Sequence, residues 1–192
     1  APSRRSRSRS HLHAATLGSG AVANHHGHLS ISTSAWVGCH TPGKRTSLMS
    51  QMATVPSALA GQYVLVNNHD CGGASMEWLL DMVIAADDGL TPGASPTLKD
   101  LDRVAATVAP GADGVMFAPW LKGMRSPAAD TAVRAAFLNI GIDAGRPQMI
   151  RAVLEGVAHR GADLLDAATA DTGIDIHTVR VDGGMSRNPT FV

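Results

Sequence analysis

The sequence lacks the features that define several classes of protein. Only two of its 192 residues are cysteines, Cys39 and Cys71, and their positions do not have the spacing of a zinc site. Such a chain is not a disulfide-rich secreted domain, and reduced cytosolic thiols are the simpler interpretation. No apolar run approaches the roughly 18 uninterrupted residues that a membrane-spanning helix needs. We therefore expect a soluble, cytoplasmic protein.

Aromatic residues are also scarce, at 4% of the chain, whereas alanine, glycine and valine abound. Small side chains of this kind favour close packing of helices on a sheet. The hydrophobic share is 44% and the charged share 17%, and 192 residues are enough to bury the core of one domain. Composition therefore agrees with a single domain of helices and strands.

The hydrophobic pattern predicts three helices in the middle of the chain. The first has apolar residues on one face over about 76–84. The second covers about 97–108 and begins at Thr97, with Asp100 as its capping partner. The third, from about 147 to 170, is the longest. Loops are expected in three stretches without clear periodicity or rich in small residues: 40–62, 85–97 and 108–115.

The stretch 176–189 carries the most information about function. Apolar residues such as Val179 and Val181 are typical of a strand, which then enters the glycine pair Gly183 and Gly184 and the start of a helix. Paired glycines let a ligand approach the backbone, and the first N–H groups of a helix point outward. The pattern fits a nucleotide site, and it also fits a plain strand-to-helix connection.

Two other stretches also carry features that are suited to binding a nucleotide. Residues 28–38 alternate apolar and polar side chains around Ser32, Thr33 and Ser34, which is typical of a hairpin with a hydroxyl-rich turn. Hydroxyls and turn N–H groups there are suited to holding phosphate. A second glycine pair, at 72–73, enters an amphipathic helix.

These three elements, in this order, resemble the C-terminal domain of the FGGY carbohydrate kinases, a branch of the superfamily of actin-like, sugar-kinase and Hsp70 ATPases. The resemblance covers about residues 11–192 and is greatest toward the xylulokinases. Two longer patterns support it: 119–127, where Met124 replaces a glutamate, and 135–155, where Asn139 replaces a glycine. The resemblance implies an α/β, ribonuclease H-like fold, present here as an incomplete C-terminal domain.

The resemblance also implies a set of nucleotide contacts. In the family the hairpin turn contacts the ATP phosphates, and Thr33 matches that contact while Ser32 stands in place of a glycine. The C-terminal glycine pair and Asn188 would border adenine and ribose, and Glu77 stands where related glycerol kinases have glutamine. Eight residues are assigned in this way: Ser32, Thr33, Ser34, Gly73, Glu77, Gly183, Gly184 and Asn188.

The expected activity is transfer of the ATP γ-phosphate, with Mg²⁺ as a second cofactor, to a sugar such as D-xylulose, giving xylulose 5-phosphate. Phosphoryl transfer needs a carboxylate that accepts the proton of the acceptor hydroxyl. In the family this is an aspartate, and counting back from Gly18 places His11 at its position. No residue of the chain is therefore assigned as a catalytic base or as a metal ligand.

Domain organisation follows from the same resemblance. Residues 12–192 are expected to form the nucleotide-binding domain, truncated at its C-terminus, and the sugar-binding N-terminal domain is expected to be absent. Residues 1–11 break with this composition because they carry four arginines, several serines and no acidic residue. We expect a disordered leader, either translated from a wrong frame or able to bind polyanions.

Six of the nine histidines lie in the first 40 residues. Such a tract is suited to a transition metal. The cluster His25, His26 and His28 is expected in a turn before the hairpin, where polar residues are common, and no partner has ligand spacing. Asp182, beside the C-terminal glycine pair, is expected to orient the loop, to bind a ribose or to cap the strand end.

Two functions follow. The first is an FGGY-type kinase that acts on a sugar, with the missing domain supplying most sugar contacts. The second is a catalytically silent nucleotide-binding remnant with a basic tail. Fold resemblance alone does not separate them. From the chain by itself we expect no turnover.

Overall fold

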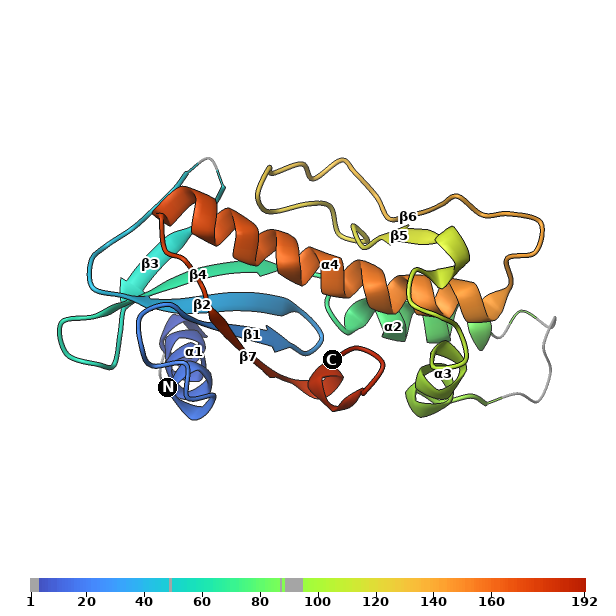
Figure 1. Ribbon diagram of the computed structural model, residues 1–192, viewed down its shortest axis with the longest axis horizontal. Coiled ribbons are helices and arrows are strands. Elements are labelled where there is room, and N and C mark those ends of the chain that lie inside the picture. Colours follow the sequence, from blue (N-terminus) through green and yellow to red (C-terminus); the bar gives the residue numbers. More distant parts are fainter. Residues whose placement is uncertain (1–3, 49, 87, 89–94) are drawn as a thin grey trace.

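The computed structural model of the chain describes residues 4–48, 50–86, 88 and 95–192. Its centre is a five-stranded sheet in the order β3-β4-β2-β1-β7 (Figure 1). The first four of these are antiparallel neighbours, and β7 runs parallel to β1. The strands are β1 (His26–Ile31), β2 (Ala35–Thr41), β3 (Ala53–Pro56), β4 (Tyr63–His69) and β7 (Thr178–Asp182).

A long helix, α4 (Arg146–Thr172), crosses one face of the sheet and extends well beyond it. On that face Leu29 of β1 packs against Gly161, where a Cβ would lie 3.2 Å from the leucine side chain. The opposite face is covered by α1 (Arg4–Gly18). Thr16 of this helix lies against Gly38 of β2, at 3.6 Å from a built Cβ. The sheet is thus sandwiched between two helices.

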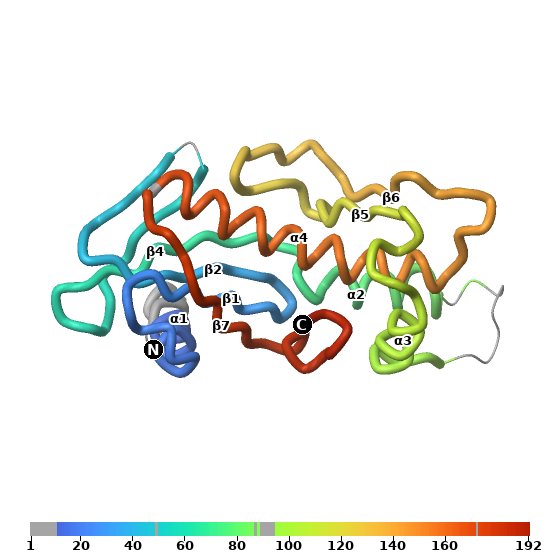
Figure 2. The backbone as a smooth tube through the Cα atoms, in the orientation of Figure 1, coloured from blue at the N-terminus to red at the C-terminus, as the bar shows by residue number. Residues whose placement is uncertain are grey.

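The remaining elements lie around the part of α4 that extends beyond the sheet. They are α2 (Ala74–Leu79), its π-helical continuation η1 (Leu80–Ile84), α3 (Leu98–Ala105), the 3-10 turn η2 (Ala112–Gly114), and the antiparallel pair β5 (Met116–Ala118) and β6 (Ala136–Leu138). A final 3-10 turn, η3 (Gly184–Arg187), follows β7. Figure 2 shows the backbone returning from the end of α4 along β7 to this turn.

Helix α4 is the spine of the core. Its buried apolar residues Val153 and Leu154 pack with α2, α3 and β5, and Val157 and Leu164 pack with the sheet. Burial of side chains of this size contributes roughly 1.5–3 kcal/mol each. At Gly156 a Cβ would collide with the carbonyl oxygen of Phe117, so glycine is what allows α4 and β5 to touch.

The structure confirms the helices with the clearest sequence signals. Helix α3 begins after Thr97, whose backbone N–H donates to Asp100 Oδ2 at 2.9 Å, as the capping pattern predicts. Helix α4 matches the stretch expected at about 147–170. It starts where Gly145 N–H donates to Gln148 Oε1 at 3.0 Å, and it ends at Gly173 with φ of 67°.

Three expectations about the N-terminal and loop regions need correction. The stretch 40–62, expected to be a loop, contains β3, because a four-residue edge strand is too short to show alternation. The stretch 108–115 contains η2. The histidine cluster lies in β1 from His26 onward and not in a turn, since His28 packs into the sheet. Part of 85–97, also expected to be a loop, lies outside the described residues.

The leader also differs from expectation. Residues 1–11 were expected to be disordered, but α1 is continuous from Arg4 through Gly18. Arginine is among the better helix formers, and the intervening serines do not interrupt the helix. Among the described residues, no helix combines the length and apolar character needed to cross a membrane. Cys39 and Cys71 are free and buried, and burial raises the pKa of the Cys39 thiol to about 11.

Candidate functional site

The turn of the β1–β2 hairpin is held by the first glycine pair. Gly73 N–H donates to the carbonyl of Ser32 at 2.5 Å, and Ala74 N–H donates to the carbonyl of Thr33 at 3.0 Å. A Cβ on Gly73 would lie 2.7 Å from the Ser32 oxygen, and one on Gly72 would lie 2.8 Å from the Ser34 backbone. Glycine is required at both positions because the turn rests directly on them.

The second glycine pair contacts the same hairpin. Gly183 has φ of 94°, and a Cβ there would collide with the backbone of Ile31. Gly184 is different, because no atom lies within 4 Å of its built Cβ. Gly183 therefore joins the C-terminal segment to the hairpin, and Gly184 faces open space.

These elements enclose a cavity of about 350 Å³. Its wall includes six of the eight residues that the sequence assigns to nucleotide: Ser32, Thr33, Gly73, Glu77, Gly184 and Asn188. Of the other two, Gly183 supports the wall from behind, and Ser34 lines a second pocket on the other side of the turn. Segments from both ends of the chain therefore meet in one cavity.

The sequence reasoning missed the part of the cavity wall that α3 supplies. Leu98 and Asp102 lie four residues apart, on one face of α3, and both line the cavity. Asn188, which is 6% exposed, donates its Nδ2 hydrogen to Asp102 Oδ1 at 2.7 Å. Burial raises the pKa of the Asp102 carboxyl. No local sequence pattern links Asp102 to Asn188, because the two residues are far apart in the chain. The i, i+4 spacing does place Asp102 on the same face of α3 as Leu98.

A second pocket, of about 510 Å³, lies on the other side of the hairpin turn. Ser32 and Ser34 line it together with His11 from α1, Asn68 and Arg125. No aspartate or glutamate belongs to the described wall of this pocket. His11, which the sequence analysis places at the base position, thus lines the same pocket as the hairpin turn and brings an imidazole instead of a carboxylate.

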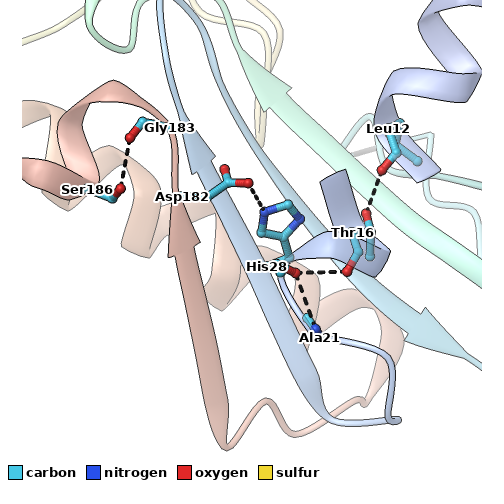
Figure 3. Close-up of polar contacts among 8 residues, drawn as sticks. Leu12, Thr16, Ala21, His28, Asp182, Gly183 and Ser186 are labelled. Atoms are coloured by element: carbon cyan, nitrogen blue, oxygen red, sulfur yellow. Dashed lines mark hydrogen bonds and ion pairs between the residues drawn. The ribbon is translucent and has the colours of Figure 1, made fainter. Parts of the chain in front are cut away.

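Asp182, immediately before the second glycine pair, is paired with a buried histidine (Figure 3). His28 Nε2 lies 3.0 Å from Asp182 Oδ2, and the His28 ring packs edge-on against Trp36 with centroids 4.6 Å apart. Burial lowers the pKa of His28, and Asp182 opposes that shift in part. One turn further, Ser186 donates its hydroxyl hydrogen to the Gly183 carbonyl at 2.8 Å. The pair ties the end of β7 to β1.

Two departures from the family pattern have a local explanation in the backbone. Asn139, in the place of a glycine, has φ of 58°, a conformation that asparagine tolerates better than most residues. Ser32 also stands where a glycine is expected, yet it does not have a positive φ. A serine is therefore compatible with the turn as it is built here. Among the described residues, no three histidine, cysteine, aspartate or glutamate side chains gather as a metal site.

The chain is similar to known proteins of one family. The family model for the FGGY family of carbohydrate kinases, C-terminal domain, matches residues 27–192. A glycerol kinase from Shewanella baltica (strain OS185) is 36% identical over 126 residues, which are 66% of this chain and 24% of the relative. A glycerol kinase from Gloeobacter violaceus is 37% identical over 116 residues, or 60% of this chain and 21% of the relative.

Solved structures give the same fold. A xyloylose kinase from Brucella ovis superposes with a TM-score of 0.82 at 26% identity, covering 94% of this chain and 35% of that one. Plasmodium falciparum glycerol kinase with ADP superposes with a TM-score of 0.78 at 22% identity, covering 94% and 35%. The chain thus spans a minor part of each relative. On the family match, the chain belongs to the FGGY family of carbohydrate kinases and corresponds to its C-terminal domain.

Proposed function

We propose that this chain is the nucleotide-binding part of a cytoplasmic, ATP-dependent carbohydrate kinase that phosphorylates D-xylulose. The observation that carries the proposal is the cavity between the hairpin turn and the two glycine pairs, which collects six predicted nucleotide contacts from distant segments. Glycerol is the second candidate acceptor, because the curated relatives at 36–37% identity are glycerol kinases. D-xylulose is favoured by the sequence resemblance and by the likeness to the Brucella ovis kinase.

The two ends of the cavity suit the two ends of a nucleotide. Thr33 is exposed at the tip of the hairpin, where its hydroxyl is available to a phosphate oxygen. Met76 and Leu98, from α2 and α3, offer apolar surface for a base. Gly184 leaves room for a ligand to approach its backbone.

The other pocket would receive the acceptor and the transferred phosphoryl group. When Mg²⁺ is bound with ATP it neutralises charge on the phosphate oxygens. The described wall of this pocket offers Ser34 and Arg125 but no carboxylate, so the metal would be held mainly by the phosphates and by the sugar-binding domain of the family. His11 at the base position favours a third reading, a nucleotide-binding protein without turnover.

Nucleotide binding is tested first, by calorimetric titration of the chain with ADP. A Cβ at Gly184 meets no atom within 4 Å, so the variant Gly184→Leu adds its side chain at the cavity wall, and we expect it to weaken ADP binding at least about tenfold, or 1.4 kcal/mol. Gly141→Leu is the matched control, because Gly141 is exposed, also has no neighbour within 4 Å, and lies outside the cavity. A folded wild-type chain that does not bind ADP would contradict the proposal.

The acceptor is tested by ADP release from Mg²⁺ and ATP with D-xylulose or glycerol. Release that depends on D-xylulose supports the kinase as proposed, and release that depends on glycerol replaces the sugar. ADP binding with neither acceptor consumed supports the catalytically silent protein, which is the result we expect from this chain alone because it has His11 at the base position.

A further inference from the structure

Helix α3 places a carboxylate, Asp102, in the wall of the cavity, and the sequence resemblance assigns it no role. Asp102 projects from the same face as Leu98, one turn away, and both line the cavity. The wall of the cavity includes Thr33 of the hairpin turn as well as Leu98 and Asp102 of α3. A nucleotide whose phosphates contact the hairpin turn would therefore direct its base toward Asp102.

The hydrogen bonds of Asn188 fix which oxygen of Asp102 is free. The N–H of Thr190 donates to Asn188 Oδ1 at 2.9 Å, so Asn188 directs its Nδ2 toward Asp102 and donates to Oδ1 at 2.7 Å. Within the described part of the chain, no other hydrogen bond or ion pair engages the side chain of Asp102. Its second oxygen, Oδ2, keeps its lone pairs for a ligand.

The surroundings of Asp102 define what the free oxygen can recognise. Met76, Leu98 and Met185 form apolar surface beside it, suited to the faces of a purine. An ionised carboxylate accepts hydrogen bonds and donates none. Adenine presents a donor at its 6-amino group, whereas hypoxanthine and guanine present an acceptor, O6, at the same place.

We propose that Asp102 selects adenine over 6-oxopurines, by accepting a hydrogen bond from the 6-amino group at Oδ2 while Asn188 holds Oδ1. The inference deepens the proposed function and rests on it, because it requires a nucleotide in this cavity. A 6-oxopurine would set its O6 against the carboxylate, two acceptors facing each other without a proton between them. Burial also raises the pKa of the Asp102 carboxyl.

The test compares ADP with inosine 5′-diphosphate, which has the same ribose and phosphates, by calorimetry at pH 8. We expect wild type to bind ADP at least about tenfold more tightly than inosine diphosphate. Asp102→Asn keeps the shape and still accepts from Asn188, but it offers an amide donor in place of Oδ2. This variant should bring the ratio to about one or invert it. Asp166→Asn, an exposed residue of α4 outside the cavity, should leave the ratio unchanged.

The outcomes separate this inference from the function beneath it. A wild-type chain that binds neither nucleotide fails at the level of the proposed function. Equal affinities of wild type for both nucleotides, or an unchanged ratio in Asp102→Asn, overturns base selection while leaving nucleotide binding intact. An equal loss of both ligands in the variant would place Asp102 against the ribose, and it also overturns the inference.

A ligand-side measurement needs no variant and guards against a misfolded protein. Purine riboside 5′-diphosphate lacks the 6-amino group and adds no oxygen. We expect wild type to bind it less tightly than ADP and more tightly than inosine diphosphate, since it loses the donor without gaining a repelled acceptor. Affinity equal to that of ADP would overturn the inference.

Discussion

The two sides of the β1–β2 hairpin turn differ in how many of the residues expected for their function they contain. On the cavity side, three of the predicted nucleotide contacts, Thr33, Gly184 and Asn188, line one cavity. On the other side, the pocket beside Ser34 contains His11, at the position where the family resemblance predicts a carboxylate. One turn thus separates the predicted nucleotide contacts from the predicted base position. We therefore predict that nucleotide binding and phosphoryl transfer depend on opposite sides of this turn.

We expect the largest loss of stability at Gly183, because the backbone there packs directly against the hairpin that both sides share. Gly183→Ala adds a Cβ that collides with Ile31 at a φ of 94°, so we expect a loss of about 4 kcal/mol or more in the free energy of unfolding. Urea denaturation followed by circular dichroism measures it. The neighbouring change Gly184→Ala meets no atom within 4 Å and should stay within about 0.5 kcal/mol of wild type. Equal stability of the two variants would refute the close approach of β7 to the hairpin.

Lowering the pH should reduce the folding stability of both sides of the hairpin turn, because His69 lies at the end of β4. His69 is 5% exposed and pairs in register with Ala35, the first residue after the hairpin turn. Burial, followed by the nearby charge of Arg160, lowers the pKa of His69 from 6.5 to about 4. The unfolded chain therefore takes up a proton first as the pH falls. Stability should be full above pH 6.5 and decline toward pH 4, by about 3 kcal/mol for this group.

The measurement is urea denaturation of the wild type and of His69→Gln at pH 7.5 and at pH 5. The variant lacks the titrating group, so its stability should change less between the two pH values. His28, whose pKa burial also lowers, remains in both proteins and adds a decline of the same sign. A decline that is as steep in His69→Gln as in wild type would show that His69 is not the source.

The smallest effects distinguish one side from the other. Thr33→Ala removes an exposed hydroxyl of the cavity wall, and we expect ATP affinity to fall about tenfold, because a hydrogen bond to a charged group contributes about 1.5–3 kcal/mol. Adenosine, which has no phosphate, should bind this variant as it binds wild type. His11→Ala lies in the other pocket, so ATP affinity should stay within about twofold, or 0.4 kcal/mol. If both variants weaken ATP equally, the two pockets do not have separate roles.

The sequence predicts those parts of the molecule that local patterns determine. The hairpin turn at Ser32 to Ser34, the cap of α3 at Thr97 and the length of α4 all follow from residue types at short spacing. What it missed depends on contacts between distant segments. Strand β3 exists because β4 offers it an edge, and Asp102 belongs to the cavity because Asn188 reaches it from the other end of the chain.

The histidines also show that local patterns do not predict contacts between distant segments. Polarity places His28 in a turn, yet the residue is fully buried against Trp36 and Asp182. A short sequence pattern shows the composition of a segment, but it does not show which residues of neighbouring strands will contact it. Buried polar residues are the hardest to predict for this reason, since their burial is tolerated only where a partner is supplied.

The pairing of β7 with β1 has a consequence for how the protein is made. The hairpin and the first glycine pair are synthesised well before β7, which pairs with β1, and before the second glycine pair, which completes the cavity wall. Contacts between such distant segments form slowly, because a long loop must close before they contribute any stability. Until β7 docks, one edge of β1 stays unpaired, and the nascent chain is open to wrong strand partners and to aggregation. A nucleotide that favours the closed cavity would shorten that exposure, so the ligand would act as a folding aid.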